Sequence, residues 1–137
     1  MSDVAYLDGP KGRKLAYVKT EGKGPCVVFL SGFMSDMEGT KAVHLEAWAK
    51  AQGRAFLRFD YSGHGESGGE FREGTISRWL KQSLAVFEAC TSGPQILVGS
   101  SMGAWIALRM SSRVESVARR GKVDVIGQVF FVAAGAG

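Results

Sequence analysis

The chain has 137 residues, 45% of them hydrophobic, so it is long enough for one hydrophobic core and too short for two. Its formal charge of +4 comes from Lys and Arg residues scattered singly apart from Arg119-Arg120, which excludes the basic stripe typical of nucleic-acid-binding proteins. No apolar run approaches the ~18 residues of a membrane span, and the start of the chain lacks the apolar stretch of a signal peptide. We therefore expect a cytoplasmic protein with no nucleic-acid partner and no membrane span.

Strand patterns and helix patterns alternate along the chain. The predicted strands are 4–7 and 15–20, which form a hairpin, then 26–30, 55–59, 95–98 and one within 125–132. The predicted helices are 40–52, 76–87 and 102–120. In the first helix we expect Val43, Ala47 and Ala51 to form the buried stripe, and we expect the three tryptophans, all in helices, to pack on the sheet.

This alternation predicts an α/β fold: a mostly parallel sheet with helices on both faces. In such sheets a ligand binds at the carboxyl ends of the strands, so the loops that follow 26–30, 55–59 and 95–98 are the candidate functional loops.

The stretch from Ile96 to Trp105 reads ILVGSSMGAW, and only Ser101 stands in the middle of a G-x-S-x-G pattern. A strand candidate precedes it and a helical pattern begins at Met102, which is the order that a catalytic serine on a strand-to-helix turn requires. The alternative is a glycine turn whose serines cap the following helix, an interpretation that suits Ser100 better than Ser101.

The cysteines and histidines indicate no metal site and no cofactor. Cys26 and Cys90 lie far apart in sequence and in no metal or redox spacing, so we expect two reduced, buried thiols. His44 lies in a helix pattern with no acidic or sulfur partner at ligand spacing.

Three loops, in chain order, resemble those of the α/β-hydrolases. LSGFMSDMEGTKA is similar to their oxyanion loop, with Ser31 where many members have histidine; RFDYSGHGESGG resembles their D-x-x-G-x-G-x-S turn; GPQILVGSSMGAW resembles their nucleophile turn. The loops are most similar to the palmitoyl-protein thioesterase and acyl-glucuronide hydrolase subgroup. The resemblance covers nearly the whole chain but only the first half of the family's domain.

The resemblance implies that Ser101 is the nucleophile that forms an acyl-enzyme with a small-molecule carboxylic ester or thioester. It also implies that the backbone N–H groups of Phe33 and Met102 form the oxyanion hole. His64 and Asp60 are implied to shape their own loop. The strand before His64 is expected to lie two strands from Ser101, too far for His64 to act as the base.

The family order is nucleophile, acid, histidine, but after Ser101 this chain contains only Glu115 and Asp124 as carboxylate side chains and no histidine. We therefore interpret 1–137 as the N-terminal part of a single α/β-hydrolase domain, catalytically inactive alone. The final apolar strand, with Val129, Phe130 and Phe131, is then expected to expose an edge through which the chain self-associates.

Two other functions remain open at this stage. A non-catalytic α/β-hydrolase relative that binds a ligand or a protein in the crevice would also lack the histidine. A flavodoxin-like nucleotide or flavin binder shares the strand-helix alternation, although no G-x-G-x-x-G or Walker pattern follows the first buried strand.

Overall fold

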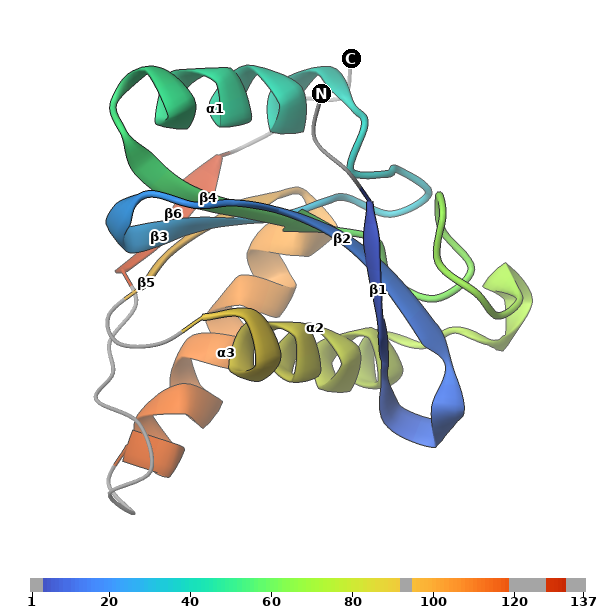
Figure 1. The fold of residues 1–137 in the computed structure, drawn as a ribbon. Coiled ribbons are helices and arrows are strands. Elements are labelled where there is room, and N and C mark those ends of the chain that lie inside the picture. Colours follow the sequence, from blue (N-terminus) through green and yellow to red (C-terminus); the bar gives the residue numbers. More distant parts are fainter. Residues whose placement is uncertain (1–3, 92–94, 119–127, 133–137) are drawn as a thin grey trace.

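The computed structural model describes residues 4–91, 95–118 and 128–132, which form one six-stranded sheet with helices on both faces (Figure 1). The strand order is β1-β2-β4-β3-β5-β6. The strands are β1 (Ala5–Asp8), β2 (Lys14–Thr20), β3 (Lys23–Leu30), β4 (Arg54–Phe59), β5 (Gln95–Ser100) and β6 (Gln128–Val132). The predicted α/β class with a mostly parallel sheet is confirmed.

The parallel part of the sheet consists of β4, β3, β5 and β6, while the β1–β2 hairpin is antiparallel and joins through β2 to β4. The loops that follow β3, β4 and β5 therefore leave the sheet at one edge, with β3 in the centre. β3 and β5 pair in register from Cys26 opposite Gln95 to Leu30 opposite Gly99, which brings the ends of both strands side by side.

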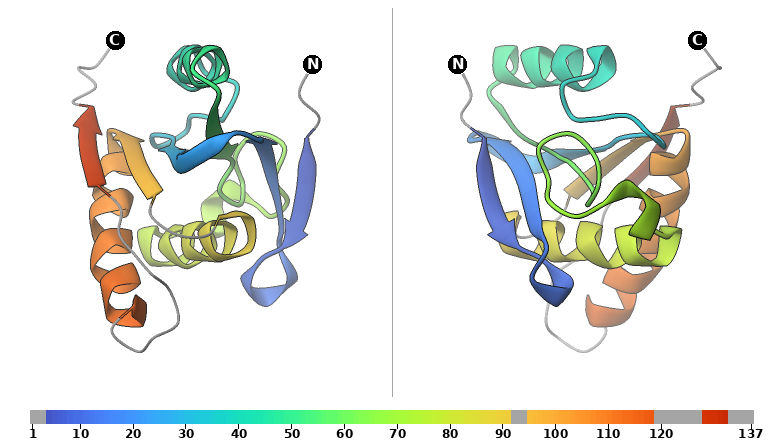
Figure 2. Two further views of the ribbon diagram at one scale, coloured as in Figure 1. Left: turned by 60° about the vertical axis from the view of Figure 1, so that its left-hand side comes forward. Right: turned by 90° about the vertical axis from the view of Figure 1, so that its right-hand side faces the viewer.

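One helix covers one face of the sheet and two cover the other (Figure 2). The helices are α1 (Thr40–Ala51), α2 (Ile76–Cys90) and α3 (Met102–Ala118), with short 3-10 turns η1 (Pro10–Gly12) and η2 (Phe71–Glu73). α1 lies alone, and α2 and α3 pack together beneath the opposite face. Thr75 caps α2, because its side chain accepts a hydrogen bond from the Arg78 N–H.

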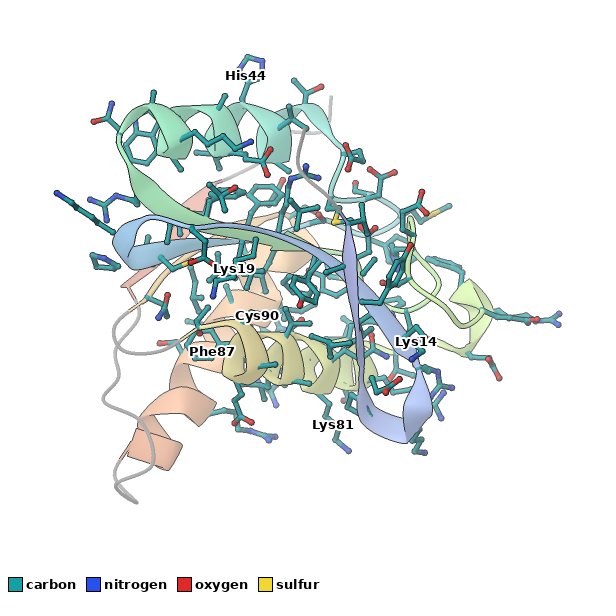
Figure 3. All side chains as sticks on the ribbon, in the orientation of Figure 1. Lys14, Lys19, His44, Lys81, Phe87 and Cys90 are labelled. Carbon is teal, nitrogen blue, oxygen red and sulfur yellow. The ribbon has the colours of Figure 1, made fainter. Side chains whose placement is uncertain are left out.

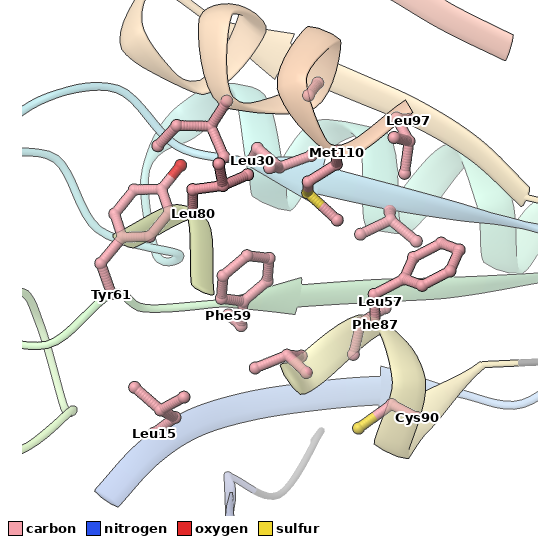
Figure 4. Packing of buried hydrophobic residues seen from close by; sticks show 14 of the residues in the cluster. Leu15, Leu30, Leu57, Phe59, Tyr61, Leu80, Phe87, Cys90, Leu97 and Met110 are labelled. Atoms are coloured by element: carbon pink, nitrogen blue, oxygen red, sulfur yellow. The ribbon is translucent and has the colours of Figure 1, made fainter. Parts of the chain in front are cut away.

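The larger core lies between the sheet and the α2–α3 layer (Figure 4). Alternation along β3 divides its side chains between the two faces: Val28 and Leu30 enter this core, while Val27 and Phe29 pack under α1. Tyr61, the second residue after β4, is fully buried and closes the core at the end nearest the candidate functional loops.

The expected buried stripe of α1 is wrong. Val43, Ala47 and Ala51 are exposed, and α1 instead buries Ala42, Glu46 and Ala49. Small alanines let the helix approach the sheet closely, and Glu46 is buried because it pairs with a buried arginine of β4. A pattern of apolar letters cannot identify a helix face whose central side chain is a carboxylate.

The expectation for the tryptophans holds for one of the three. Trp79 of α2 is 3% exposed, but Trp48 of α1 and Trp105 of α3 are 48% and 53% exposed. None of the helices formed by the described residues is long and apolar enough to span a lipid bilayer.

Candidate active site at the carboxyl ends of β3, β4 and β5

Ser101 occupies the turn between β5 and α3 and is exposed to solvent. Its φ angle is 56°, a left-handed conformation that costs a residue with a side chain free energy, and its carbonyl accepts a hydrogen bond from the Ala104 N–H at 3.0 Å. Ser100 and Met102 on either side are less exposed. The serine hydroxyl is therefore presented at the tip of a strained strand-to-helix turn.

The two glycines of the G-x-S-x-G pattern allow backbones to approach where no side chain would fit. A Cβ on Gly99 would lie 2.3 Å from the Ala104 nitrogen, and one on Gly103 would lie 2.0 Å from the Leu30 carbonyl oxygen. Gly103 thus lets the first turn of α3 pack directly on the end of β3. This contact holds the turn at Ser101 against the neighbouring loop.

The β3–α1 loop passes beside Ser101. A Cβ on Gly32 would lie 3.2 Å from the Ser100 carbonyl oxygen and 3.4 Å from the Ser101 Cβ, so the backbone of this loop lies close to the turn that carries Ser101. The chain then turns, with the Ser35 N–H donating to the Gly32 carbonyl at 3.1 Å and Met34 at a φ of 59°. Phe33 lies at the tip of this turn.

The backbone N–H groups of Phe33 and Met102 donate no hydrogen bond to any described residue. Met102 is the first residue of α3, so its N–H belongs to the positive end of a helix. Both residues adjoin the close approach of Gly32 to Ser101. The site thus offers two free donors beside one exposed hydroxyl.

His64 does not act on Ser101 in this structure. Its Nε2 accepts a hydrogen bond from the Met34 N–H at 3.2 Å, so Nδ1 carries the proton and donates to the Ser62 carbonyl at 3.0 Å. The ring is buried, and β3 lies between the strands that lead to His64 and Ser101. As expected, His64 shapes its own loop, through the hydrogen bond to Ser62. It also holds the neighbouring loop that carries Phe33, through the hydrogen bond from the Met34 N–H.

Asp60 ties the same two loops together. Its carboxylate accepts from the Met37 N–H at 2.7 Å and from the Glu66 N–H at 2.9 Å. Burial raises the pKa of the Asp60 carboxyl above its ordinary value, and these two N–H groups oppose the shift. Gly65 lies against this carboxylate, where a Cβ would collide with it.

Aromatic rings form the wall of the site away from α1. Phe33 is 5.2 Å from Phe71 and 6.0 Å from Trp79 between ring centroids, and His64 lies 5.1 Å from Trp79. A hollow of about 370 Å³ opens between the loops after β3 and β4 and is lined by Met34, His64 and Phe71 among others. Phe33 and Met34 are 52% and 72% exposed, so an apolar surface borders the hollow.

A buried ion-pair network beneath the site is not evident from the sequence. Arg58 of β4 donates through Nε to Glu46 at 2.8 Å and through one terminal nitrogen to both the Met37 carbonyl and Glu38. Burial lowers the pKa of the guanidinium, but the bonds to Glu46 and Glu38 outweigh burial and raise it. Arg58 thereby anchors α1 and the β3–α1 loop to the sheet.

The described residues bring no histidine or carboxylate side chain into hydrogen-bond contact with Ser101. His44, the other histidine, is exposed on α1 and points away from the sheet (Figure 3). Glu115 lies in the part of α3 whose side chains are not described, and Asp124 lies outside the described residues. Within the described ranges no three His, Cys, Asp or Glu residues cluster in a way that would hold a metal ion.

Comparison with known proteins identifies relatives of this arrangement. Residues 27–137 match the model of the alpha/beta hydrolase family. The chain is 43% identical to the human mitochondrial palmitoyl-protein thioesterase ABHD10 over 117 residues, 85% of this chain and 38% of the relative. The bovine protein of the same name is also 43% identical, over 105 residues that make up 77% of this chain and 34% of the relative.

Solved structures share the fold. Mouse alpha/beta hydrolase domain-containing protein 10 superposes with a TM-score of 0.77 at 38% identity, covering 92% of this chain and 49% of that chain. A protein from Agrobacterium vitis S4 superposes with a TM-score of 0.84 at 39% identity, covering 93% and 50%. The chain thus spans about half the length of these structures and less of the curated relatives.

The relatives overturn one expectation and establish another. A cytoplasmic location is contradicted, because the curated relatives are named as mitochondrial proteins. Targeting signals are recognised by import receptors and do not change the composition of the folded domain. Composition therefore does not predict the compartment in which such a domain is found. The resemblance of the three loops is upheld by the family match and by the superposed structures: the chain belongs to the alpha/beta hydrolase family.

Proposed function

We propose that the full-length protein is a serine hydrolase of carboxylic esters or thioesters in which Ser101 is the nucleophile. The observation that carries this proposal is an exposed serine, held at a φ of 56°, beside the free N–H groups of Phe33 and Met102. Relatives at 43% identity are named palmitoyl-protein thioesterases, which supports hydrolysis of an acyl bond.

In the proposed reaction the Ser101 oxygen forms a bond to the acyl carbon while its proton passes to a general base. The carbonyl oxygen becomes an oxyanion that accepts hydrogen bonds from the Phe33 and Met102 N–H groups, each such donor stabilising the transition state by ~3 kcal/mol. Collapse of this intermediate breaks the bond to the leaving thiolate or alkoxide, which takes up the proton and leaves an acyl-enzyme. Water then gives a proton to the general base and attacks the acyl carbon; the bond to the Ser101 oxygen breaks, the carboxylic acid leaves, and the base returns the proton to Ser101.

We further propose that residues 1–137 form the N-terminal part of the catalytic domain and are inactive alone. The general base and its acid partner then come from residues outside this chain, in the family order of nucleophile, acid and histidine. The engaged nitrogens of His64 support this, since its Nε2 already accepts a backbone N–H and its Nδ1 donates to a carbonyl. Without a base the serine proton has no acceptor, and only residual catalysis remains.

The proposed substrate carries an acyl chain that lies against Phe33, Met34 and Phe71. Met34 and Phe71 line the 370 Å³ hollow between the loops that follow β3 and β4, and the Phe33 ring packs against Phe71. Burial of each methylene contributes ~0.8 kcal/mol, so kcat/KM should rise with chain length until the hollow is filled. A series of p-nitrophenyl esters and thioesters measures this, and a preference for acetyl over longer chains would contradict the apolar acyl wall.

Labelling with a fluorophosphonate tests the nucleophile. The full-length protein should form one adduct, at Ser101, and Ser101→Ala should abolish both the adduct and ester hydrolysis. Ser112→Ala, which changes an exposed serine of α3, is the matched control and should keep both. An adduct elsewhere would reject Ser101, and a folded protein that neither labels nor hydrolyses would instead be a non-catalytic member of the family.

A further inference from the structure

A second cavity, of about 240 Å³, opens beside Ser101 on the α1 side of the sheet. Its wall consists of the end of β3, the loop that follows, the first turn of α1, and Ser100. Gly32 lies between the cavity and the nucleophile, because it lines the cavity and approaches the Ser101 Cβ closely. Phe33, Met34 and Phe71 do not line this cavity, which shares only Ser35 and Asp36 with the hollow that the proposed acyl wall borders.

Backbone donors line one side of this cavity. α1 is twelve residues long, and its N-cap, Gly39, has no side chain to accept a hydrogen bond from the first turn. The N–H groups of Thr40, Lys41 and Ala42 donate no hydrogen bond to the described residues. Three free N–H groups at the positive end of a helix form a ready binding surface for an anion.

A lysine adds a full positive charge. The Lys41 ammonium reaches across the cavity and donates to the Ser100 hydroxyl at 3.3 Å. Ser100 is the residue next to the proposed nucleophile and belongs to a different element from Lys41, so the cation is held toward the site. An ammonium beside free backbone N–H groups favours an oxyanion that accepts from both.

The Ser31 hydroxyl points to a missing partner. Ser31 lines the cavity and is 3% exposed, yet its Oγ has no hydrogen-bond partner. Alternation along β3 continues from Val27 and Phe29, which pack under α1, and places the Ser31 side chain on the same face. A buried hydroxyl is normally hydrogen-bonded, so the unpartnered Ser31 Oγ in the cavity wall is a second observation that favours a polar ligand here.

We propose that this cavity is an anion subsite that binds a carboxylate or phosphate group of the substrate whose acyl bond is cleaved at Ser101. The link to cleavage rests on the proposed function, whereas anion binding itself does not. The only carboxylate among the lining residues is Asp36, which already accepts the Glu38 N–H at 2.9 Å. The negative charge of Asp36 repels an incoming anion, so it lowers the affinity of the subsite without changing where the anion would bind.

Titration of the full-length protein with inorganic phosphate and, separately, with acetate tests the subsite at constant ionic strength. Saturable binding of either anion is expected, and the two arms decide between a tetrahedral and a planar oxyanion. Lys41→Met should weaken this binding about tenfold, because it removes a charged donor. Asp36→Asn keeps the acceptor for Glu38 but removes the repelling charge, so it should strengthen binding about threefold.

A matched control removes a lysine elsewhere. Lys81, on the outer side of α2, borders a separate hollow with Lys11, Arg13 and Arg78 (Figure 3). Lys81→Met should leave anion binding unchanged. The subsite is wrong if neither anion binds saturably, if Lys41→Met keeps wild-type affinity with a native circular dichroism spectrum, or if Lys81→Met is the variant that loses binding.

Ester hydrolysis assays distinguish binding of an anion in this cavity from cleavage of a substrate at Ser101. Wild-type protein should prefer an ester that bears a carboxylate over its neutral amide analogue, and Lys41→Met should abolish the preference mainly through KM. Equal preference in both proteins would overturn the link between anion and substrate. If no ester is cleaved at all, the proposed function fails while the phosphate and acetate titrations still decide whether the subsite exists.

Discussion

His64 contributes to the site through the hydrogen bonds of its two nitrogens. Its position between the Met34 N–H and the Ser62 carbonyl fixes the peptide that follows Phe33, one of the two proposed oxyanion donors. Trp79 also donates to the Ser62 carbonyl, and Gln82 both accepts from the Ser62 N–H and donates to its hydroxyl. Hydrogen bonds through Ser62 and His64 therefore connect α2 to the loop that carries Phe33.

We predict that His64→Ala lowers kcat of the full-length protein by roughly 10- to 100-fold with little change in KM. The Met34 N–H would lose its acceptor, and the neighbouring Phe33 N–H would shift. The shift should cost less rate than the complete loss of an oxyanion donor would. His64→Gln, which retains an acceptor, should recover part of the rate, and His44→Ala on the outer face of α1 is the control. An unchanged kcat in His64→Ala would show that the loop holds its shape without the imidazole.

The buried thiols predict a loss of stability in alkaline solution. Burial raises the pKa of Cys26 to about 11 from an ordinary value of 9.0, and burial also raises the pKa of Cys90 (Figure 3 shows Cys90 facing the sheet). Between pH 9 and pH 11 the unfolded thiol has ionised while the folded Cys26 thiol is still protonated. The unfolded state binds fewer protons, so the free energy of unfolding falls as pH rises.

Denaturant unfolding at intervals from pH 8 to pH 11 measures this effect. Cys26→Ala should lose less stability over this range than the wild-type chain, because only the wild type has this thiol to ionise on unfolding. Identical slopes in the two proteins would mean that the Cys26 thiol is not protected by the fold.

Single residues differ in how far the sequence reveals their role. The position of Ser101 on a strand-to-helix turn follows from the letters around it, because the glycine spacing and the flanking patterns are local. The proximity of Ser31, Lys41 and Ser100 does not, since these residues meet only when β3, α1 and β5 are assembled. Their residue types are ordinary, so no local pattern marks them.

At the scale of elements, α1 is joined to the sheet by a buried ion pair. Arg58 and Glu46 have side chains that are 6% and 8% exposed and bond at 2.8 Å, whereas Glu38 on the same guanidinium is 57% exposed. Two carboxylates thus contact one cation in very different environments. Their removal should have very different consequences.

We predict that Glu46→Ala lowers the free energy of unfolding by ~3 to 5 kcal/mol, because it leaves the Arg58 charge buried and poorly compensated. Glu38→Ala, the matched control on the exposed side, should cost no more than ~1 kcal/mol. The double variant Arg58→Met with Glu46→Leu should recover much of the loss, since it removes both charges and keeps the volume. Equal costs for the two glutamate variants would refute the distinction; urea titration provides the values.

Element boundaries follow closely from the sequence, but packing between elements does not. Each predicted strand and helix overlaps an observed one, because Gly, Pro and Thr residues punctuate the chain at the ends of the apolar patterns. A Cβ on Gly103 would lie 2.0 Å from the Leu30 carbonyl oxygen only because α3 packs on β3. This contact joins two segments that are distant in sequence. Only the structure therefore explains why a glycine is required at the second glycine position of the G-x-S-x-G pattern.

At the scale of the whole molecule, strand-helix alternation predicts the parallel sheet but leaves the strand order open. The order β1-β2-β4-β3-β5-β6 depends on which strands pair, and β2 joins β4 antiparallel although β4, β3, β5 and β6 run parallel to one another. The location of the functional loops at one edge could still be anticipated, because all parallel strands end at the same edge.

We predict that the isolated 137-residue chain self-associates through β6. Within the described residues β6 pairs only with β5 and forms one edge of the sheet, and its sequence, QVFFV, is apolar after Gln128. Free N–H and C=O groups on such an edge pair with another chain. Sedimentation should show association that Phe131→Lys reduces and that Tyr6→Lys, on the opposite edge strand β1, does not; a monodisperse wild-type monomer would contradict the prediction.

The central position of β3 has a consequence for how the site forms during folding. Its partner on one side, β5, lies about 70 residues further along the chain, and α1, β4 and α2 intervene. Contacts between such distant segments carry a large loop-closure entropy and form slowly. We expect the Gly32 loop and the Ser101 turn to come into contact only after the central strands of the sheet have paired. The signal of a spectroscopic probe near Ser101 should therefore change in this last step and not while the helices form.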